Sequence, residues 1–167
     1  KAQLRQDIFA LSQLNYKKNG YFVEFGATDG IYFSNSYLLE KKYDWTGILS
    51  EPAKTWHEDL KNNRSAIIET NCVWKNSGET IEFFETEDPA LSTVGIFNDK
   101  DNHATSRVKT KPYYVQTISL EEMLDKYSAP KEIDFLSIDT EGSELSILEN
   151  FDFTKYQFRV ICCEHNY

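Results

Sequence analysis

The sequence lacks the features that mark several large classes of protein. Its longest apolar runs are far shorter than the roughly 20 residues that a membrane-spanning helix needs. Its first residues, KAQLRQDIFALSQLNYKKNG, show no signal-peptide pattern and predict an amphipathic helix instead. The only cysteines are Cys72, Cys162 and Cys163, without C-x-x-C or any other zinc spacing. We therefore expect no membrane span, buried free thiols and a reducing compartment, the cytoplasm.

Positive charge is also scarce. The formal net charge is -9, and the basic clusters are short: Lys17-Lys18, Lys41-Lys42 and residues 107–111. A surface that follows a phosphate backbone needs clustered lysine and arginine, so long nucleic acid is a poor partner. An acidic protein tolerates a cationic small-molecule ligand well. The sequence specifies no oligomeric state.

What the chain does contain is the pattern of an α/β domain. Its 167 residues, 40% of them hydrophobic, are enough for one domain over residues 1–167. Short apolar segments predict strands at 21–25, 45–50, 66–70, 133–138 and 158–163. Helices are predicted between them, at 34–42, 52–62, 119–127 and 143–150. This alternation predicts a mostly parallel central sheet with helices on both faces.

The middle of the chain departs from that alternation. The segments GETIEFFE and KPYYVQTISL are typical of antiparallel strands, so we expect an inserted hairpin. Between them lies a polar segment, residues 88–111, which is long for a loop in a compact domain. A flap on the substrate side and simple disorder are the two interpretations.

Ligands of open parallel sheets bind beyond the carboxyl ends of the strands. The first strand ends in EFGATDG, with Glu24, Gly26, Asp29 and Gly30. The dinucleotide pattern G-x-G-x-x-G is absent, because Thr28 stands where that pattern needs glycine. The two acids would repel a diphosphate and suit an ammonium or sulfonium group. The alternative is a tight turn with two solvated acids.

The next two strands also end in polar residues. Glu51 follows the second strand, about 20 residues after Gly30, where an acid commonly binds ribose hydroxyls. The alternative for Glu51 is a carboxylate at a helix N-terminus, favoured by the helix dipole. Asn71 and Cys72 follow the third strand and could border an adenine ring.

The last two strands end in candidates for acid–base chemistry. The run Asp139-Thr140-Glu141-Gly142-Ser143-Glu144 follows one of them, and His165 follows the other. Closely spaced carboxylates are unfavourable unless they are solvated, paired, protonated or metal-bound. Helix capping explains Glu144 better than Asp139. His165 is either a base or a structural hydrogen-bonding residue.

Taken together, these segments resemble the FkbM family of S-adenosylmethionine-dependent methyltransferases. The matching segments are VEFGATDGIYFSNSYLLE, WTGILSEP, NNRSAIIETNCVW, TISLEEML, IDFLSIDTEGSELSILENF and VICCEHN. The resemblance implies a Rossmann-like class I methyltransferase sandwich. In that fold two more strands follow the fifth, so we expect the C-terminal strands to have been cut off or to belong to a longer parent protein. The fifth strand would then be an exposed edge.

The resemblance also implies roles for the residues. The methionine end of S-adenosylmethionine would be held by Glu24, Gly26, Asp29 and Gly30, with Asn35 nearby. The ribose would be held by Glu51, the adenine flanked by Asn71 and Cys72, and the sulfonium and acceptor faced by Asp139 and Glu141. The family typically methylates hydroxyl oxygens of sugars and natural products, so the expected partner is a small-molecule acceptor.

A hydroxyl acceptor benefits from a general base, for which Asp139 and His165 come first and Glu141 third. A metal-assisted variant is an alternative, with Mg²⁺ on oxygens of Asp139, Glu164 and Asn166. Two other classes compete with the methyltransferase. One is an NAD-dependent oxidoreductase, which the missing glycine pattern disfavours, and the other is a non-catalytic cofactor-binding module of the same fold.

Overall fold

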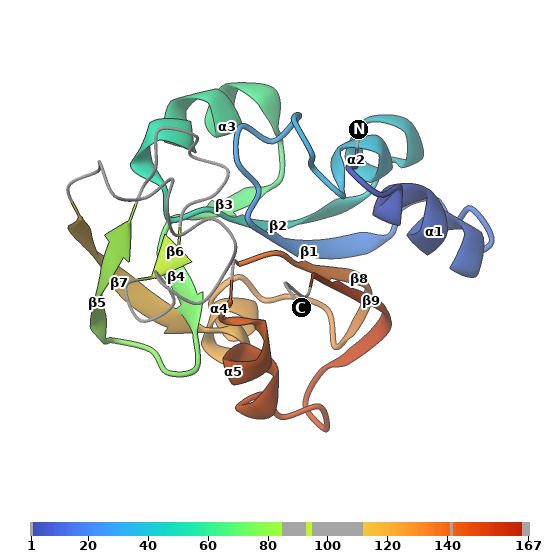
Figure 1. Cartoon of the computed structure of the whole chain (residues 1–167). Helices are drawn as coiled ribbons and strands as arrows, with labels where there is room; N and C mark the ends of the chain where they lie inside the picture. Colours follow the sequence, from blue (N-terminus) through green and yellow to red (C-terminus); the bar gives the residue numbers. More distant parts are fainter. Residues whose placement is uncertain (1, 85–92, 95–111, 141, 165–167) are drawn as a thin grey trace.

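A parallel five-stranded sheet forms the centre of the protein (Figure 1). The structure is a computed structural model that describes residues 2–84, 93–94, 112–140 and 142–164. The strand order is β3-β2-β1-β8-β9, and every pair in it is parallel. The strands are β1 (Tyr21–Phe25), β2 (Thr46–Ser50), β3 (Ile67–Glu69), β8 (Glu132–Ile138) and β9 (Gln157–Cys163). The order changes direction at β1, which places a switch point between β1 and β8.

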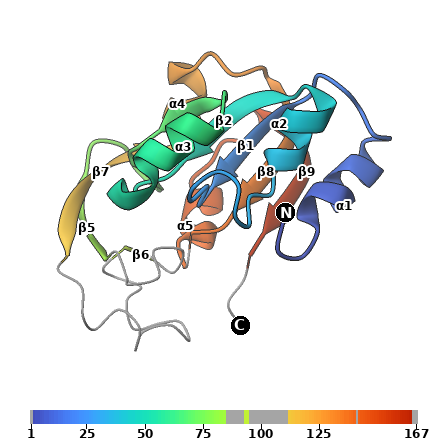
Figure 2. The same cartoon turned by 90° about the horizontal axis from the view of Figure 1, so that it is seen from above.

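Helices cover both faces of this sheet (Figures 1 and 2). One layer consists of α1 (Gln6–Gln13), α2 (Tyr37–Tyr43) and α3 (His57–Asn63), the last preceded by the short 3₁₀ helix η1 (Lys54–Trp56). The other consists of α4 (Leu120–Lys126) and α5 (Glu144–Glu149). Alternate residues of β1 divide between the two cores, because Phe22 packs on the first layer and Val23 on the second.

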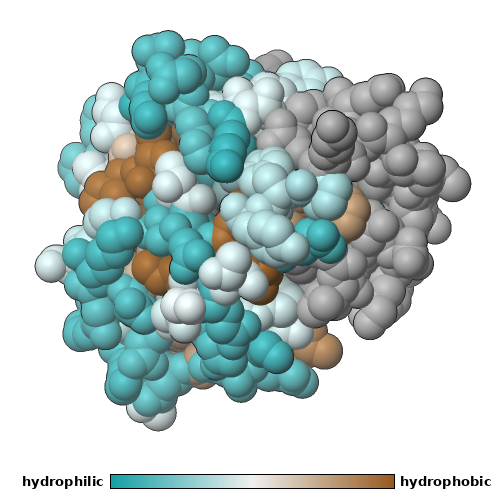
Figure 3. Space-filling view, turned by 90° about the vertical axis from the view of Figure 1, so that its left-hand side faces the viewer, coloured by the Kyte–Doolittle hydropathy of each residue, from teal (hydrophilic) through white to brown (hydrophobic). Residues whose placement is uncertain are grey.

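A smaller mixed sheet extends the domain on one side. Its order is β4-β7-β5-β6, and the strands are β4 (Cys72–Trp74), β7 (Tyr113–Ser119), β5 (Thr80–Phe84) and β6 (Thr93–Val94). β5 and β7 pair antiparallel, as the sequence predicted for the inserted hairpin. On the side of the protein that carries this sheet, the described residues are largely hydrophilic, with separate hydrophobic patches between the polar side chains (Figure 3).

The α/β prediction is confirmed, and the differences have local causes. The helix expected from residue 34 begins at Tyr37, because Ser34, Asn35 and Ser36 bind a buried carboxylate instead. The helix expected at 52–62 is divided into η1 and α3. Cys72 was expected in a loop after the third strand, but it begins β4 and pairs with Thr117 of β7.

Other expectations about the chain have mixed outcomes. The thiols were expected to be buried, which holds for Cys72, whereas Cys162 is half-buried and Cys163 is exposed. Cys163 is the last residue of β9, and β9 pairs only with β8 among the described strands. Residues 88–111 lie outside the described residues except for Thr93 and Val94. In the part of the chain that the structure describes, no helix is long and apolar enough to cross a membrane.

The contact between β1 and β2 gives a test of the fold. A Cβ atom added to Gly47 would lie 2.1 Å from the backbone oxygen of Phe22, its partner on β1. Gly47→Ala should therefore lower the free energy of unfolding by about 1–3 kcal/mol or more, measured by urea denaturation. Thr46→Ala, at the exposed neighbouring position, should lower it by less than about 1 kcal/mol. Equal losses in the two variants would contradict this packing.

Candidate active site

The carboxyl ends of β1, β2 and β8 meet at one edge of the central sheet. The backbone N–H of Gly26, just after β1, donates to Ser50 at the end of β2 at 3.0 Å. On its other side Gly26 approaches Asp139, just after β8. A Cβ atom at Gly26 would lie 2.2 Å from the Asp139 backbone oxygen, and Gly26 has a φ of +73°. Only glycine fits both this conformation and this approach. The sequence-predicted residues Gly26, Glu51 and Asp139 thus lie at neighbouring strand ends.

Glu51 orients two backbone segments of this edge. It is buried, and its Oε2 accepts a hydrogen bond from the Thr28 N–H at 2.8 Å. Its Oε1 accepts from the Ala53 N–H, also at 2.8 Å. The bond with Ala53, the residue before η1, agrees with the interpretation of Glu51 as a carboxylate at a helix end. The bond with Thr28 shows that the same carboxylate also holds the loop after β1. These contacts fix the direction of its oxygen atoms at the edge.

Asp29 shapes the same loop. Its Oδ1 accepts from the N–H groups of Ile31 and Tyr32 at 2.8 and 2.7 Å. Its backbone oxygen accepts from the Asn63 side chain at 2.8 Å. Gly30 follows with a φ of +80°, and a Cβ there would lie 2.5 Å from Arg64 Cγ. The turn is therefore stabilised by its own Asp29 side chain and by contacts from residues at the end of α3.

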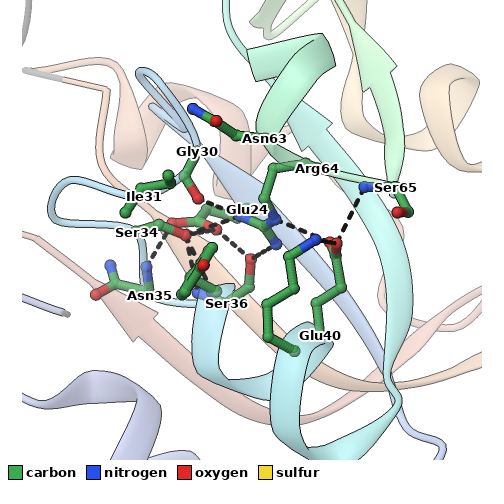
Figure 4. Close-up of polar contacts among 12 residues, drawn as sticks. Glu24, Gly30, Ile31, Ser34, Asn35, Ser36, Glu40, Asn63, Arg64 and Ser65 are labelled. Carbon is green, nitrogen blue, oxygen red and sulfur yellow. Dashed lines mark hydrogen bonds and ion pairs between the residues drawn. The ribbon is translucent and has the colours of Figure 1, made fainter. Parts of the chain in front are cut away.

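Glu24 is buried inside the sheet layer and is satisfied by the next part of the chain (Figure 4). Its Oε1 accepts from the Asn35 N–H at 2.6 Å. Its Oε2 accepts from the hydroxyls of Ser34, at 3.0 Å, and of Ser36. Burial raises the pKa of Glu24 above its usual value, while the nearby Arg64 and these hydrogen bonds oppose that rise. The carboxylate therefore organises three consecutive residues just before α2.

Arg64 is a residue of this site that the sequence reasoning missed. Its guanidinium is fully buried and donates to Gly30, Ser34, Ser36 and Glu40 (Figure 4). A carboxylate within an apolar strand needs donors or a cation. A search for the partner of Glu24 could therefore have pointed to this arginine.

Asn35 provides an unpaired acceptor at this edge. Its Nδ2 donates to Ser137 Oγ at 2.9 Å, and Ser137 lies on β8 in register with Glu24. Its Oδ1 is buried without a hydrogen-bond partner among the described residues. A buried acceptor that lacks a donor is unfavourable by about 1–3 kcal/mol, so a ligand that donates a hydrogen bond there gains that energy.

The candidates for the adenine lie beside Glu51. Asn71 donates its backbone N–H to Glu69 at 2.8 Å, and its carbonyl oxygen accepts from the Ser50 hydroxyl at 3.3 Å. Cys72 is buried in a cluster with Ala53 and Trp74. Burial and the charge of Glu51 raise the pKa of Cys72 to about 12, so this thiol is neutral at physiological pH.

The acidic run after β8 separates into different roles. Glu144 Oε1 accepts from the N–H and hydroxyl of Thr140, at 2.9 and 3.0 Å, and from the Gly142 N–H at 3.1 Å. Glu144 therefore lies at the start of α5, as the sequence predicted, but it binds the loop before the helix and does not cap the N–H groups of the first turn. Asp139 is half-buried at the strand end. Glu141 and His165 lie outside the described residues.

The metal alternative stays a prediction. Glu164 follows β9 and donates its N–H to Ile138 at 2.9 Å, which brings it to the same edge as Asp139. Within the described residues, no three His, Cys, Asp or Glu side chains are grouped to hold a metal ion. The third oxygen ligand considered for Mg²⁺, Asn166, lies outside that part of the chain.

The sheet order and the acid-lined edge define a Rossmann-like methyltransferase fold. The family model of the methyltransferase FkbM domain matches residues 24–167, which is most of the chain. The chain therefore belongs to the FkbM methyltransferase family. No curated protein matches the chain.

The surroundings of the cysteines give a test of the edge. Partial burial and the carboxylates of Glu144, Asp139 and Glu164 raise the pKa of Cys163, but this thiol is exposed. Cys72 is buried and has the higher barrier to reaction. In the native protein, iodoacetamide should label Cys163 faster than Cys72, with a rate that rises with pH because the thiolate is the nucleophile. Peptide mass spectrometry measures both rates. Equal labelling would show that the Cys72 cluster is open to solvent.

Proposed function

We propose that this domain binds S-adenosylmethionine and methylates a hydroxyl oxygen of a sugar or natural-product small molecule. The observation that carries the proposal is the buried Oδ1 of Asn35, which has no hydrogen-bond partner among the described residues, on a residue whose backbone N–H binds the Glu24 carboxylate. A buried acceptor without a donor favours a ligand group that donates hydrogen bonds, and the acids collected at this edge favour a group that is positively charged. The ammonium of the methionine end has both properties, whereas a diphosphate has neither.

The other strand ends fit the rest of this cofactor. Glu51 is oriented by the Thr28 and Ala53 N–H groups, and each carboxylate oxygen can accept more than one hydrogen bond. The same carboxylate can therefore hold the loop and accept from the ribose hydroxyls. Asn71 and Cys72, which follow β3, lie near Glu51 in space and supply the border of the adenine.

When bound, S-adenosylmethionine supplies a methyl group on a positively charged sulfur. The protein has to align the acceptor oxygen with that group, and alignment supplies most of the acceleration. A base within about 2.6–3.2 Å of the acceptor hydroxyl removes its proton. Asp139 is the candidate for this base that lies among the described residues of the edge. His165 and Glu141 are the other two candidates. Mg²⁺ is the alternative means of activating the acceptor.

Calorimetric titration separates this proposal from its competitors. Binding of S-adenosylmethionine with no binding of NAD⁺ is expected. Binding of NAD⁺ alone would favour the oxidoreductase, and binding of neither by the folded protein would contradict the proposal. A cofactor-binding protein that methylates nothing would be the non-catalytic module.

The acceptor class has its own measurement. Release of S-adenosylhomocysteine should rise above background with hydroxyl-rich acceptors, such as oligosaccharides and polyhydroxylated natural products. Amines and thiols of matched size serve as controls. Turnover with the amines alone would contradict O-methylation while leaving the cofactor assignment intact.

Glu51 gives the residue-level prediction. Glu51→Ala should weaken S-adenosylmethionine binding at least tenfold, which is about 1.4 kcal/mol. Because Thr28 and Ala53 lose their acceptor, the melting temperature of the cofactor-free variant should also fall. Glu58→Ala, an exposed acid in the first turn of α3, should change neither quantity. A lower melting temperature with unchanged affinity would leave Glu51 a purely structural role.

A further inference from the structure

Arg64 and Glu24 form a buried unit in which two hydroxyl groups connect the opposite charges. Arg64 Nη1 donates to Ser34 Oγ at 3.0 Å, and Nη2 donates to Ser36 Oγ at 2.8 Å. Each of these serines donates its own hydroxyl hydrogen to Glu24 Oε2. Neither serine therefore needs water, and both side chains are held from two directions (Figure 4).

The other hydrogen bonds of Arg64 join two further parts of the chain to this unit. Nη1 also donates to the Gly30 backbone oxygen at 2.9 Å, and Nε donates to Glu40 Oε2 on α2 at 2.8 Å. The other oxygen of Glu40 accepts from the Ser65 N–H at 3.0 Å. Arg64 thus connects the end of α3 to the turn after β1 and to the start of α2.

Asn35 lies between the two serines in the chain, so the hydrogen bonds that hold them also restrict its position. Its N–H donates to Glu24 Oε1 at 2.6 Å, and its Nδ2 donates to Ser137 at 2.9 Å. Two hydrogen bonds therefore fix Asn35, whose Oδ1 has no hydrogen-bond partner among the described residues. A small displacement of this atom would matter, because a hydrogen bond weakens steeply once its geometry departs from the ideal.

We propose that Arg64 is a positioning residue for the methyl donor: through Ser34, Ser36 and Glu24 it places Asn35 Oδ1 for the ammonium of the methionine end. This inference rests on the proposed function. In it, Asn35 contacts the cofactor, while Arg64 acts through other side chains.

The charge of Arg64 gives this role a distinctive pH dependence. Burial raises the pKa of Glu24, and Arg64 opposes the rise more than any of the hydrogen bonds does. Among the described residues, the charged groups that face Glu24 are Arg64 from the end of α3 and, beyond it, Glu40 of α2. Without Arg64, Glu24 takes up a proton at a higher pH. A protonated Glu24 loses acceptor capacity for the serines and the Asn35 N–H, so the position of Asn35 is lost as the pH falls.

The test measures the dissociation constant of S-adenosylhomocysteine between pH 5.5 and 8.5 in four proteins: wild type, Arg64→Ala, Arg64→Lys and Lys61→Ala. Arg64→Ala should bind S-adenosylhomocysteine at least tenfold more weakly than the wild type. Its affinity should fall further as the pH is lowered, over a higher pH range than the one in which the wild type loses affinity. Arg64→Lys keeps the charge but not the fork of donors, so it should lose affinity several-fold with the wild-type pH profile. Lys61→Ala removes an exposed cation of the same helix and should match the wild type.

Each outcome separates the positioning role from its alternatives. Adding Glu24→Gln to Arg64→Ala should abolish the pH dependence, which assigns it to Glu24. Wild-type affinity and pH profile in Arg64→Ala would overturn the proposal, as would a loss that is the same at every pH. Should Arg64→Ala fail to fold, unchanged affinity in Arg64→Lys would overturn it. Failure of the wild type to bind would instead overturn the proposed function.

Discussion

The arrangement of this domain depends on a carboxylate buried in its central strand. Glu24 lies on β1, between neighbouring strands and under the layer of α2 and α3, where an unpaired charge would be strongly unfavourable. The chain meets this constraint by interrupting the start of α2. Ser34, Asn35 and Ser36 lie outside the helix and donate to Glu24 instead. Arg64 supplies the compensating charge, and the Ser36 hydroxyl lies between its guanidinium and the carboxylate. The turn, the helix start and the end of α3 are consequently fixed by one buried group.

The other acids of the edge follow the same principle on a smaller scale. Asp29, Glu51 and Glu144 each accept from two or more backbone N–H groups of nearby loops. Such bonds are charge-assisted and hold the loop backbone more firmly than neutral ones. A protein of net charge -9 can therefore collect carboxylates at one edge without leaving them as an unscreened cluster.

The sequence predicted much of the fold because its information was local. The apolar segments and the residues that end them located all five central strands, and the turn after β1 was recognised from Gly26 and Gly30. The start of α2 and the place of Cys72 could not be predicted in the same way. The first depends on Glu24, ten residues earlier in the chain, and the second on β7, more than forty residues later. Arg64 was missed for the same reason, since its contacts with Gly30 and Ser34 cross 34 and 30 residues.

These acids can both stabilise the loops and bind a ligand. A carboxylate that accepts from backbone N–H groups is held in one orientation, and so are its oxygen atoms. A ligand group is bound best by atoms that need no rearrangement when it arrives. Glu51 illustrates this, since the two N–H groups that it accepts from also determine where its remaining acceptor positions point. Asn35 is a second example. Its Nδ2 donates to Ser137, which orients the amide, and its Oδ1 has no hydrogen-bond partner among the described residues. In the proposed function, the stability of the edge and the binding of the cationic methionine end therefore depend on the same hydrogen bonds.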